Sequence, residues 1–269
     1  MILVAGGTGL LGTEILRELR TAGLPTRVLT REPARAEDAA AAGSQVVRGD
    51  VRDPASLQRA LQGVDTVVSA MHGLLGPRGV SPTSVDRDGN IALVEAARSV
   101  GADLVMVSMV GVAPDSPYEL FRAAYAGEEH LRRSGLSWTV VRAPAFLETW
   151  LGILRGTAAR SGRPTVLGRG DNPVGFASVA DVANRVAGAL TDPGSRGTVI
   201  EIEATRTCTM NHLATQVAAE AGAGKAPRHV PRPALRALGA VGGLVSPQVG
   251  RLDRTALVMD TTTDAAARA

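Results

Sequence analysis

The chain has 269 residues, of which 45% are hydrophobic and 20% charged, so it is long and apolar enough for a sizeable core and is not a disordered chain. Its single cysteine, Cys208, excludes an internal disulfide framework and fits a reducing compartment. A formal net charge of +3 is too weak a field to indicate a nucleic-acid partner, and two tryptophans, two tyrosines and three phenylalanines offer few stacking surfaces.

The sequence shows no address for a membrane or for export. No apolar stretch is long enough to cross a bilayer, and the first predicted strand starts at residue 2 without a basic leader before it. We therefore expect a cytoplasmic protein with no membrane partner. An oligomer is compatible with the sequence.

The first half of the chain alternates short apolar runs with longer helical patterns. Alternation of this kind predicts βαβ units, and hence an α/β, Rossmann-type doubly wound parallel sheet with its ligand crevice at the carboxyl ends of the strands. The predicted strands cover residues 2–5, 26–29, 45–47, 64–68, 104–107 and 137–141, and the predicted helices cover 14–20, 54–61, 85–100 and 118–133.

The rhythm changes after residue 144, where glycine, proline and polar residues become more frequent. Domain boundaries are therefore expected at 1–145, a Rossmann domain, and 146–269, which would hold the last sheet elements and a small, mostly helical C-terminal substrate lid. We expect the second region to be interleaved with the first rather than independent. Its predicted elements are a strand at 199–202 and helices at 179–190, 210–221 and 233–241, followed by a frayed tail at 261–269.

A glycine-rich loop follows the first predicted strand and opens the first helix. In this pattern Gly6 permits a tight turn, Gly9 permits close approach of a pyrophosphate, and Gly12 permits close packing of helix on strand. The phosphate would meet free N–H groups at the helix N-terminus, which also brings in Thr8, Leu10 and Leu11. The alternative is a tight turn with no ligand, but the strand before and the helix after meet the context that a dinucleotide site requires.

The residues after the second predicted strand indicate which dinucleotide would bind. NAD-binding chains usually carry an acid here, whereas this chain has Thr30 and Arg31. A guanidinium binds a 2′-phosphate through paired hydrogen bonds, so Arg31, assisted by Arg35, predicts NADP(H). The alternative is a solvated Arg31 that pairs with Glu32.

Two residues follow the third predicted strand, where an adenine ring would lie. Asp50 could accept a hydrogen bond from the exocyclic amine of the base while Val51 packs on the ring. Alternatively, Asp50 ends the strand and caps a turn. The sequence leaves both interpretations open.

These motifs together resemble an atypical short-chain dehydrogenase/reductase of the NmrA-like, NAD(P)-binding family, over about residues 1–200. The resemblance rests on the glycine loop and on the segments 30–31, 49–53, 69–70, 137–144 and 176–183. It implies that Ser69 and Ala70 line the ribose, extends the cofactor-binding set to Met71, and places the backbone of Pro144, Ala145 and Phe146 beside the nicotinamide. It also implies two kinds of role, hydride transfer to a small conjugated acceptor or binding of NADP(H) as a redox sensor.

The catalytic tyrosine and lysine that the family usually carries four residues apart are absent. The resemblance puts Leu120 and Ala124 at those positions, and the only lysine is Lys225. Tyr118 and Tyr125 are the candidate acids, although tyrosines also pack half-buried without chemistry. Ser108 takes the position of the family's serine and could bind a substrate oxygen.

The remaining polar residues indicate less. The four histidines have no metal-ligand spacing, so no metal is expected. His72 follows the fourth predicted strand and could contact a substrate, or could simply be exposed. The sequence thus predicts an NADPH-dependent reductase for a small apolar conjugated acceptor such as a quinone, an enone or a carbonyl, with a non-catalytic NADP(H) sensor as the alternative.

Overall fold

The computed structural model describes residues 1–74, 76, 79–221, 226–235, 250, 251, 255 and 260. It divides into two compact units. Unit 1 comprises Met1–Gly73, Gly79–Ala143 and Val179–Ile202, and unit 2 comprises Leu74–Arg78, Pro144–Ser178 and Glu203–Ala269.

Unit 1 is built on a seven-stranded sheet in the order β10-β6-β5-β4-β1-β2-β3, in which every neighbouring pair is parallel. All the carboxyl ends therefore meet at one edge, and the strand order reverses between β1 and β4. The strands are β1 (Ile2–Ala5), β2 (Thr26–Thr30), β3 (Gln45–Arg48), β4 (Thr66–Ser69), β5 (Asp103–Met109), β6 (Trp138–Ala143) and β10 (Thr198–Glu201).

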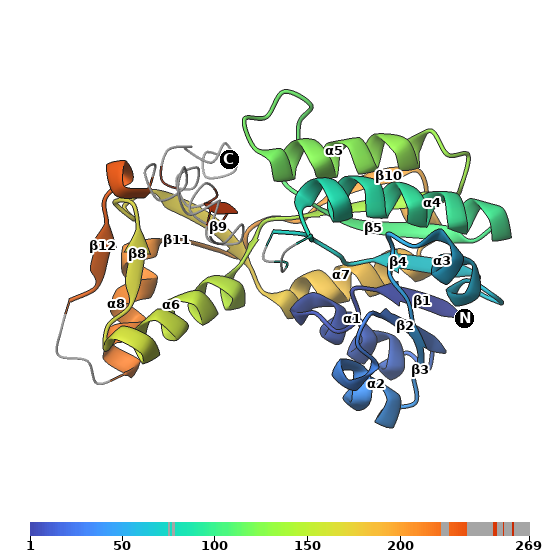
Figure 1. The fold of residues 1–269 in the computed structure, drawn as a ribbon, viewed down its shortest axis with the longest axis horizontal. Coiled ribbons are helices and arrows are strands. Elements are labelled where there is room, and N and C mark those ends of the chain that lie inside the picture. Colours follow the sequence, from blue (N-terminus) through green and yellow to red (C-terminus); the bar gives the residue numbers. More distant parts are fainter. Residues whose placement is uncertain are drawn as a thin grey trace. The chain divides into compact units, whose positions relative to one another are not determined.

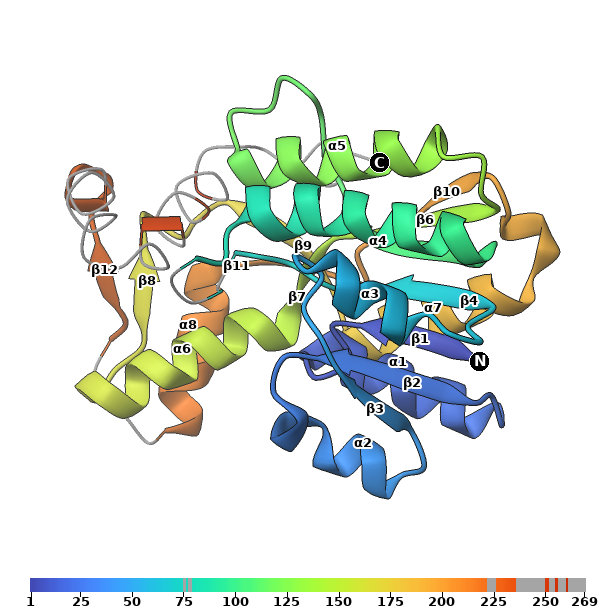
Figure 2. The same ribbon diagram turned by 45° about the vertical axis from the view of Figure 1, so that its right-hand side comes forward.

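Helices cover both faces of this sheet (Figures 1 and 2). α3, α4 and α5 lie on one face, and α1 and α7 pack against each other on the other face. The helices are α1 (Leu10–Thr21), α2 (Glu37–Ala41), α3 (Pro54–Ala60), α4 (Asp88–Val100), α5 (Glu119–Arg132) and α7 (Val179–Thr191), with short turns η1 (Pro33–Ala36), η2 (Thr83–Arg87) and η3 (Pro193–Ser195). The predicted doubly wound α/β fold is confirmed.

The core of unit 1 explains why the apolar runs form strands. All four residues of β1 are buried, as expected for a parallel strand covered on both faces. Leu3, Leu104 and Leu93 join one apolar cluster between the sheet and the α3–α5 layer. The start of α3 is capped, because the Asp53 carboxylate accepts a 3.1 Å hydrogen bond from the Ala55 N–H, and Pro54 occupies the first turn.

Unit 2 contains two small sheets as well as helices. One sheet has the order β11-β9-β7 and the other pairs β12 with β8. Phe176, Leu154 and Leu213 are fully buried in its apolar cluster. The elements are β7 (Ala145–Phe146), α6 (Leu147–Ser161), β8 (Thr165–Leu167), β9 (Pro173–Ala177), β11 (Arg206–Thr209), α8 (Met210–Glu220) and β12 (Arg228–Val230).

The helix predicted at 210–221 is confirmed as α8, whereas the strands of unit 2 and α6 were not predicted from the sequence. Of the helix predicted at 233–241, residues 233–235 are helical and 236–241 lie outside the described residues, as does the tail predicted at 261–269. No helix within the described ranges is long and apolar enough to cross a membrane.

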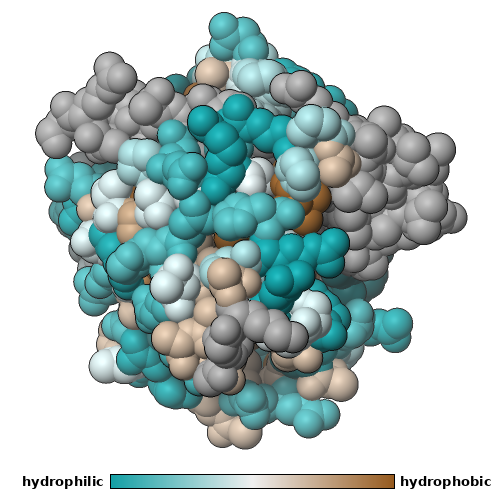
Figure 3. Space-filling model, turned by 90° about the vertical axis from the view of Figure 1, so that its left-hand side faces the viewer, coloured by the Kyte–Doolittle hydropathy of each residue, from teal (hydrophilic) through white to brown (hydrophobic). Residues whose placement is uncertain are grey.

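The described surface is largely polar. On the face shown in Figure 3 hydrophilic residues predominate, and strongly hydrophobic colour is confined to small areas. Among the large hydrophobic side chains that the structure describes, only Leu10 and Val100 are exposed. Leu10 opens α1, next to the glycine loop.

Candidate functional site

The glycine loop has the geometry that its spacing predicts. Gly6 adopts a left-handed φ of +88°, and a Cβ there would lie 2.5 Å from the carbonyl oxygen of Ala70. A Cβ on Gly12 would collide with the Gly6 carbonyl oxygen and lie 2.6 Å from the Gly7 Cα. The loop is therefore closed tightly on itself and against the end of β4, which is where the strand order reverses.

The first turn of α1 leaves its N–H groups open. In the described part of the chain, the amides of Leu10, Leu11 and Gly12 have no hydrogen-bond acceptor, and the N-cap residue Gly9 supplies no side-chain cap. No acidic residue lies in this turn, and Gly9 is exposed, whereas Thr8 is half-buried. Free amides at the positive end of a helix favour an anion, so this loop fits a pyrophosphate.

Arg31 is exposed directly after β2. It forms no ion pair or side-chain hydrogen bond among the described residues, so the predicted alternative of a pair with Glu32 is not what the structure shows. Arg35 is exposed as well. Thr30 is buried, and its hydroxyl donates to the Glu32 carbonyl at 3.1 Å and accepts from the Glu32 N–H at 3.2 Å. Thr30 thus shapes the turn that presents Arg31.

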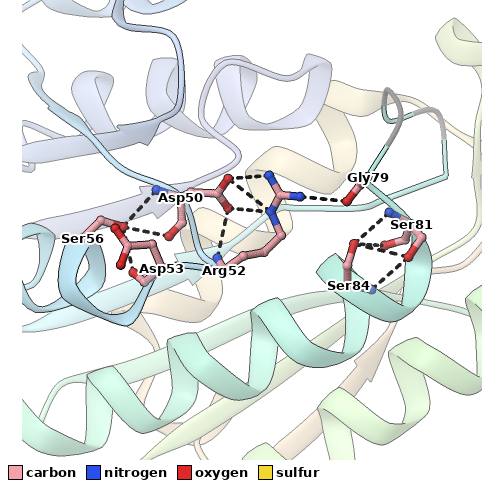
Figure 4. Close-up of polar contacts among 7 residues, drawn as sticks. All are labelled: Asp50, Arg52, Asp53, Ser56, Gly79, Ser81 and Ser84. Carbon is pink, nitrogen blue, oxygen red and sulfur yellow. Dashed lines mark hydrogen bonds and ion pairs between the residues drawn. The ribbon is translucent and has the colours of Figure 1, made fainter.

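The carboxylate of Asp50 is bound by Arg52 (Figure 4). Asp50 Oδ1 accepts from the backbone N–H of Arg52 at 3.0 Å and from its Nε at 2.9 Å, and Oδ2 accepts from Nη2 at 2.6 Å. These bonds, and to a smaller degree the charge of Arg31, hold the pKa of Asp50 below its usual value. The structure therefore favours the interpretation in which Asp50 shapes a turn.

The same arginine ties two loops of unit 1 together. Arg52 Nη1 donates to the carbonyl oxygen of Gly79 at 2.8 Å, and Ser81 and Ser84 cap each other's backbone N–H groups just beyond (Figure 4). The role of Arg52 is not predicted from the sequence, because the acids near it, Asp50 and Asp53, do not indicate its bond to Gly79.

The side chains of Val51 and Ser69, predicted to contact the adenine and the ribose, make contacts within the protein instead. Val51 is 7% exposed and packs in the core against α4, so little of it is open to a base. Ser69 is buried, and its hydroxyl donates to Asn90 Oδ1 at 2.6 Å. The backbone of Ala70 stays at the carboxyl edge, where its N–H donates to the Ala5 carbonyl, and Met71 is half-buried beside it.

The Ser108 hydroxyl is a buried polar group without a partner among the described residues. Ser108 lies near the carboxyl end of β5 and is 6% exposed, and its Oγ makes no hydrogen bond to that part of the chain. An unsatisfied buried hydroxyl costs about 1–3 kcal/mol, so this atom needs an explanation. A ligand oxygen at the edge of the sheet would satisfy it.

Neither tyrosine stands where the family's acid would be. Leu120 and Ala124 occupy the buried face of α5, and they are 9% and 6% exposed. Tyr118 lies at the N-cap position of α5, half-buried, with its ring edge-on to Phe121 at 5.6 Å between centroids. Tyr125 is half-buried on the same helix. The Tyr118 ring is thus packed against Phe121, and a catalytic role for either tyrosine stays a prediction.

Arg142 does not replace the missing lysine. It is paired with Ser108 across β6 and β5, but its guanidinium donates to the fully buried Glu128 at 3.1 and 2.8 Å, and this pairing raises the pKa of Arg142. A second carboxylate, Glu201, accepts from it at 3.0 Å. The positive charge of Arg142, next to Ser108, is therefore neutralised by Glu128 and Glu201.

The residues predicted beside the nicotinamide belong to unit 2. Ala145 and Phe146 form β7, which pairs with β9, and Phe146 precedes α6. Trp150 is 8% exposed in the core of this unit, so its ring is occupied by packing. No group of histidine, cysteine and acidic residues within the described ranges could hold a metal ion.

Comparisons with known proteins agree with this geometry. A family model described as NAD(P)H-binding matches residues 6–193. An NAD(P)H azoreductase of Xenophilus azovorans is 32% identical over 224 residues, which cover 82% of this chain and 74% of that protein. Quinone oxidoreductase 2 of Escherichia coli is 27% identical and covers 82% and 75% of the two chains.

Solved structures show the same fold. The NADPH complex of the Escherichia coli quinone oxidoreductase QOR2 superposes with a TM-score of 0.75 at 25% identity, over 99% of this chain and 93% of that one. The triphenylmethane reductase of Citrobacter in complex with NADP(H) gives a TM-score of 0.78 at 20% identity, over 98% and 91% of the two chains. The resemblance to atypical short-chain dehydrogenases/reductases is thereby confirmed, and this chain belongs to the NAD(P)H-binding family.

Proposed function

We propose that this chain is an NADPH-dependent reductase that transfers hydride to a small apolar conjugated acceptor, such as a quinone, an enone or a carbonyl compound. The observation that carries the proposal is the open first turn of α1, which lies where the strand order reverses. Arg31, which has no ion-pair partner within the described ranges, follows the neighbouring strand β2. The names of the relatives, an azoreductase and a quinone oxidoreductase, support reduction of such acceptors.

Different residues of unit 1 would bind the different phosphate groups of the cofactor. The amides of Leu10, Leu11 and Gly12 would bind the pyrophosphate, and Arg31, with Arg35 nearby in sequence, would bind the 2′-phosphate. When bound, NADPH supplies the hydride. Ala70 and Met71 would contact the cofactor through their backbone, and a contact of residues 144–146 with the nicotinamide stays a prediction.

The acceptor would be one that needs little help from a protein acid. A positioned general acid contributes typically about 10²–10⁴-fold, and α5 carries Leu120 and Ala124 where that acid and its lysine would stand. Quinones and enones form stabilised anions that water can protonate, whereas a simple ketone does not. Ser108, whose hydroxyl finds no partner in the described part of the chain, would donate to the acceptor's oxygen.

A non-catalytic NADP(H) sensor is the second candidate. The observation that favours it is the same buried pair, Leu120 and Ala124, because a sensor needs no proton donor. The two functions share the cofactor site and differ only in turnover.

Steady-state NADPH oxidation with a panel of quinones, enones and dyes separates the two. The reductase proposal predicts turnover with at least one quinone, and little turnover with simple ketones. Tight NADPH binding without turnover on any acceptor would favour the sensor. A cytoplasmic location and a small-molecule partner complete the proposal, and size-exclusion chromatography of the purified chain would give its oligomeric state.

A further inference from the structure

His72 lies in the connection after β4, beside the proposed cofactor site. β4 ends at Ser69, and the Ala70 N–H is hydrogen-bonded to β1 through the Ala5 carbonyl at 2.9 Å. The carbonyl of Ala70 is the group that a Cβ on Gly6 would strike. Ligands of open α/β sheets bind outside the carboxyl ends of the strands where the strand order reverses, which here is between β1 and β4. His72 is thus two residues beyond Ala70, whose carbonyl lies against Gly6 of the glycine loop.

The backbone on the other side of His72 is also anchored. The Gly73 N–H donates to the buried carboxylate of Asp86 at 2.7 Å, and a Cβ on Gly73 would collide with the Ser81 carbonyl and lie 2.9 Å from the Pro82 nitrogen. With Ala70 held by β1 and Gly73 held by η2, the imidazole between them projects from a well-defined position. A side chain on a fixed backbone can orient a ligand with little entropic cost.

The imidazole itself is uncommitted. It is exposed, and within the described ranges it has no hydrogen-bond partner. Surrounding protein nevertheless desolvates it and lowers its pKa below the ordinary histidine value, which favours the neutral ring with one N–H donor and one acceptor nitrogen. Exposure and desolvation coexist when water reaches a side chain from one side only.

We propose that His72 is a catalytic residue of the reductase, whose ring N–H donates a hydrogen bond to the carbonyl oxygen of a quinone or enone acceptor. This inference rests on the proposed reductase function. A neutral imidazole is suited to the task, because a donor that need not lose its proton can polarise a carbonyl by hydrogen bonding alone.

The chemistry balances without a protein acid. The hydride forms a new C–H bond on the conjugated acceptor, the displaced π electrons move through the conjugated system, and the carbonyl electron pair moves onto oxygen. The acceptor is reduced by two electrons to an oxyanion while the nicotinamide is oxidised. The His72 N–H stabilises the charge that develops on this oxygen, and a proton from water completes the product.

The experiment compares two acceptors that differ in where charge develops. Menadione accepts hydride next to a carbonyl whose oxygen becomes negative, whereas malachite green is a cation that is neutralised at carbon and develops no oxyanion. His72→Phe should lower kcat/KM for menadione about 10- to 100-fold, less than the ~10²–10³ of an enclosed oxyanion donor because water reaches the ring. For malachite green the loss should stay within about threefold.

Matched variants separate hydrogen bonding from structure. His72→Gln keeps an N–H donor and should retain menadione reduction to within about tenfold. His130→Gln is the control, because His130 sits on α5 and contacts Glu95 at 2.8 Å, and this variant should match the wild type. NADPH affinity should be unchanged in all three variants.

A binding measurement adds a readout that does not depend on turnover. The chain has four histidines, so the imidazole proton NMR signals of untagged protein can be assigned by substitution. With NADP⁺ bound, menadione cannot be reduced, and its addition should shift the signal that is missing in His72→Gln and leave that of His130 in place.

The outcomes distinguish this inference from the function on which it rests. Equal losses for both acceptors in His72→Phe, unaltered menadione reduction, or an unmoved His72 signal would each overturn the assignment of His72. If the wild type oxidises NADPH with neither acceptor, the reductase proposal itself fails.

Discussion

Substituting alanine for Gly12 should destabilise the fold, whereas substituting alanine for Gly9 should leave the fold intact and weaken NADPH binding. A Cβ on Gly12 would collide with the Gly6 carbonyl oxygen and come within 2.6 Å of the Gly7 Cα. Both contacts are backbone atoms, which no rotamer change can move. A Cβ on Gly9 meets only the Gly6 carbonyl oxygen, at 3.3 Å, and otherwise points into open space.

Gly12→Ala should therefore lower the free energy of unfolding by about 1–3 kcal/mol, the usual cost of overpacking. Alanine is the better helix former by about 1 kcal/mol, which alone would stabilise the protein. We expect a net loss of stability because the steric clash costs more than this gain. At about 2–4 °C per kcal/mol for a chain of this size, Tm should fall by several degrees.

Gly9→Ala should instead fold normally, with a change below about 1 kcal/mol in the free energy of unfolding. Its methyl group would stand where phosphate oxygens approach the amides of Leu11 and Gly12. Loss of a single hydrogen bond to a charged group, about 1.5–3 kcal/mol, weakens NADPH binding by about 10- to 150-fold.

Circular dichroism on heating and calorimetric titration with NADPH measure the two effects side by side. The reasoning is refuted if Gly9→Ala binds NADPH as tightly as the wild type, because the phosphates would then lie elsewhere. It is equally refuted if Gly12→Ala is as stable as the wild type, since the close packing would not exist.

Three further variants test the site. Arg31→Ala should raise the Kd for NADPH about 10- to 100-fold and leave that for NADH unchanged, as measured by fluorescence titration; an equal change for both removes the 2′-phosphate contact. Tyr118→Phe and Tyr125→Phe should keep most of the reductase activity; a drop of about three decades in either would identify the acid. Asp50→Asn should cost about 1 kcal/mol at pH 7. Because the folded pKa of Asp50 is lowered, its contribution is present above its unfolded pKa of about 3.9 and is lost as the pH falls through the lower folded value. Urea unfolding at pH 7 and pH 3 should show the difference shrinking, and a constant difference would contradict it.

Much of unit 1 can be predicted from sequence because its signals are local. Ile2–Ala5 is apolar throughout and is followed at once by glycines. Asp53 caps α3, Pro54 is the first residue of that helix, and Arg31 follows a strand. Each pattern is decided by residues within one or two turns of each other, and parallel strands then bring their carboxyl ends together without further information.

Unit 2 shows where local reasoning stops. β8 and β12 have three residues each, too short for an alternating pattern to emerge, and they pair across about sixty residues of chain. α6 contains Gly152 and Gly156, which lower its apparent helix propensity. Among the described residues, a Cβ on Gly152 would meet nothing within 4 Å, and one on Gly156 would meet only the end of the Arg160 side chain of the same helix. Tertiary packing around Leu154 and Phe176 decides these elements.

The site shows the same division. The Ser69–Asn90 bond spans 21 positions, and Arg52 binds both its neighbour Asp50 and the distant Gly79, so neither partner is visible in a local pattern. Burial and hydrogen bonding depend on the surrounding fold. The buried Ser108 hydroxyl and the exposed His72 imidazole, which have no partner in the described part of the chain, could therefore not be recognised from sequence alone.

Calorimetric titration of the folded wild-type chain with NADPH and with NADH tests the central claim most directly. Free amides at the start of α1 together with Arg31 predict one NADPH per chain, bound at least about tenfold more tightly than NADH. Absence of heat with both dinucleotides, or equal affinity for the two, would contradict the account.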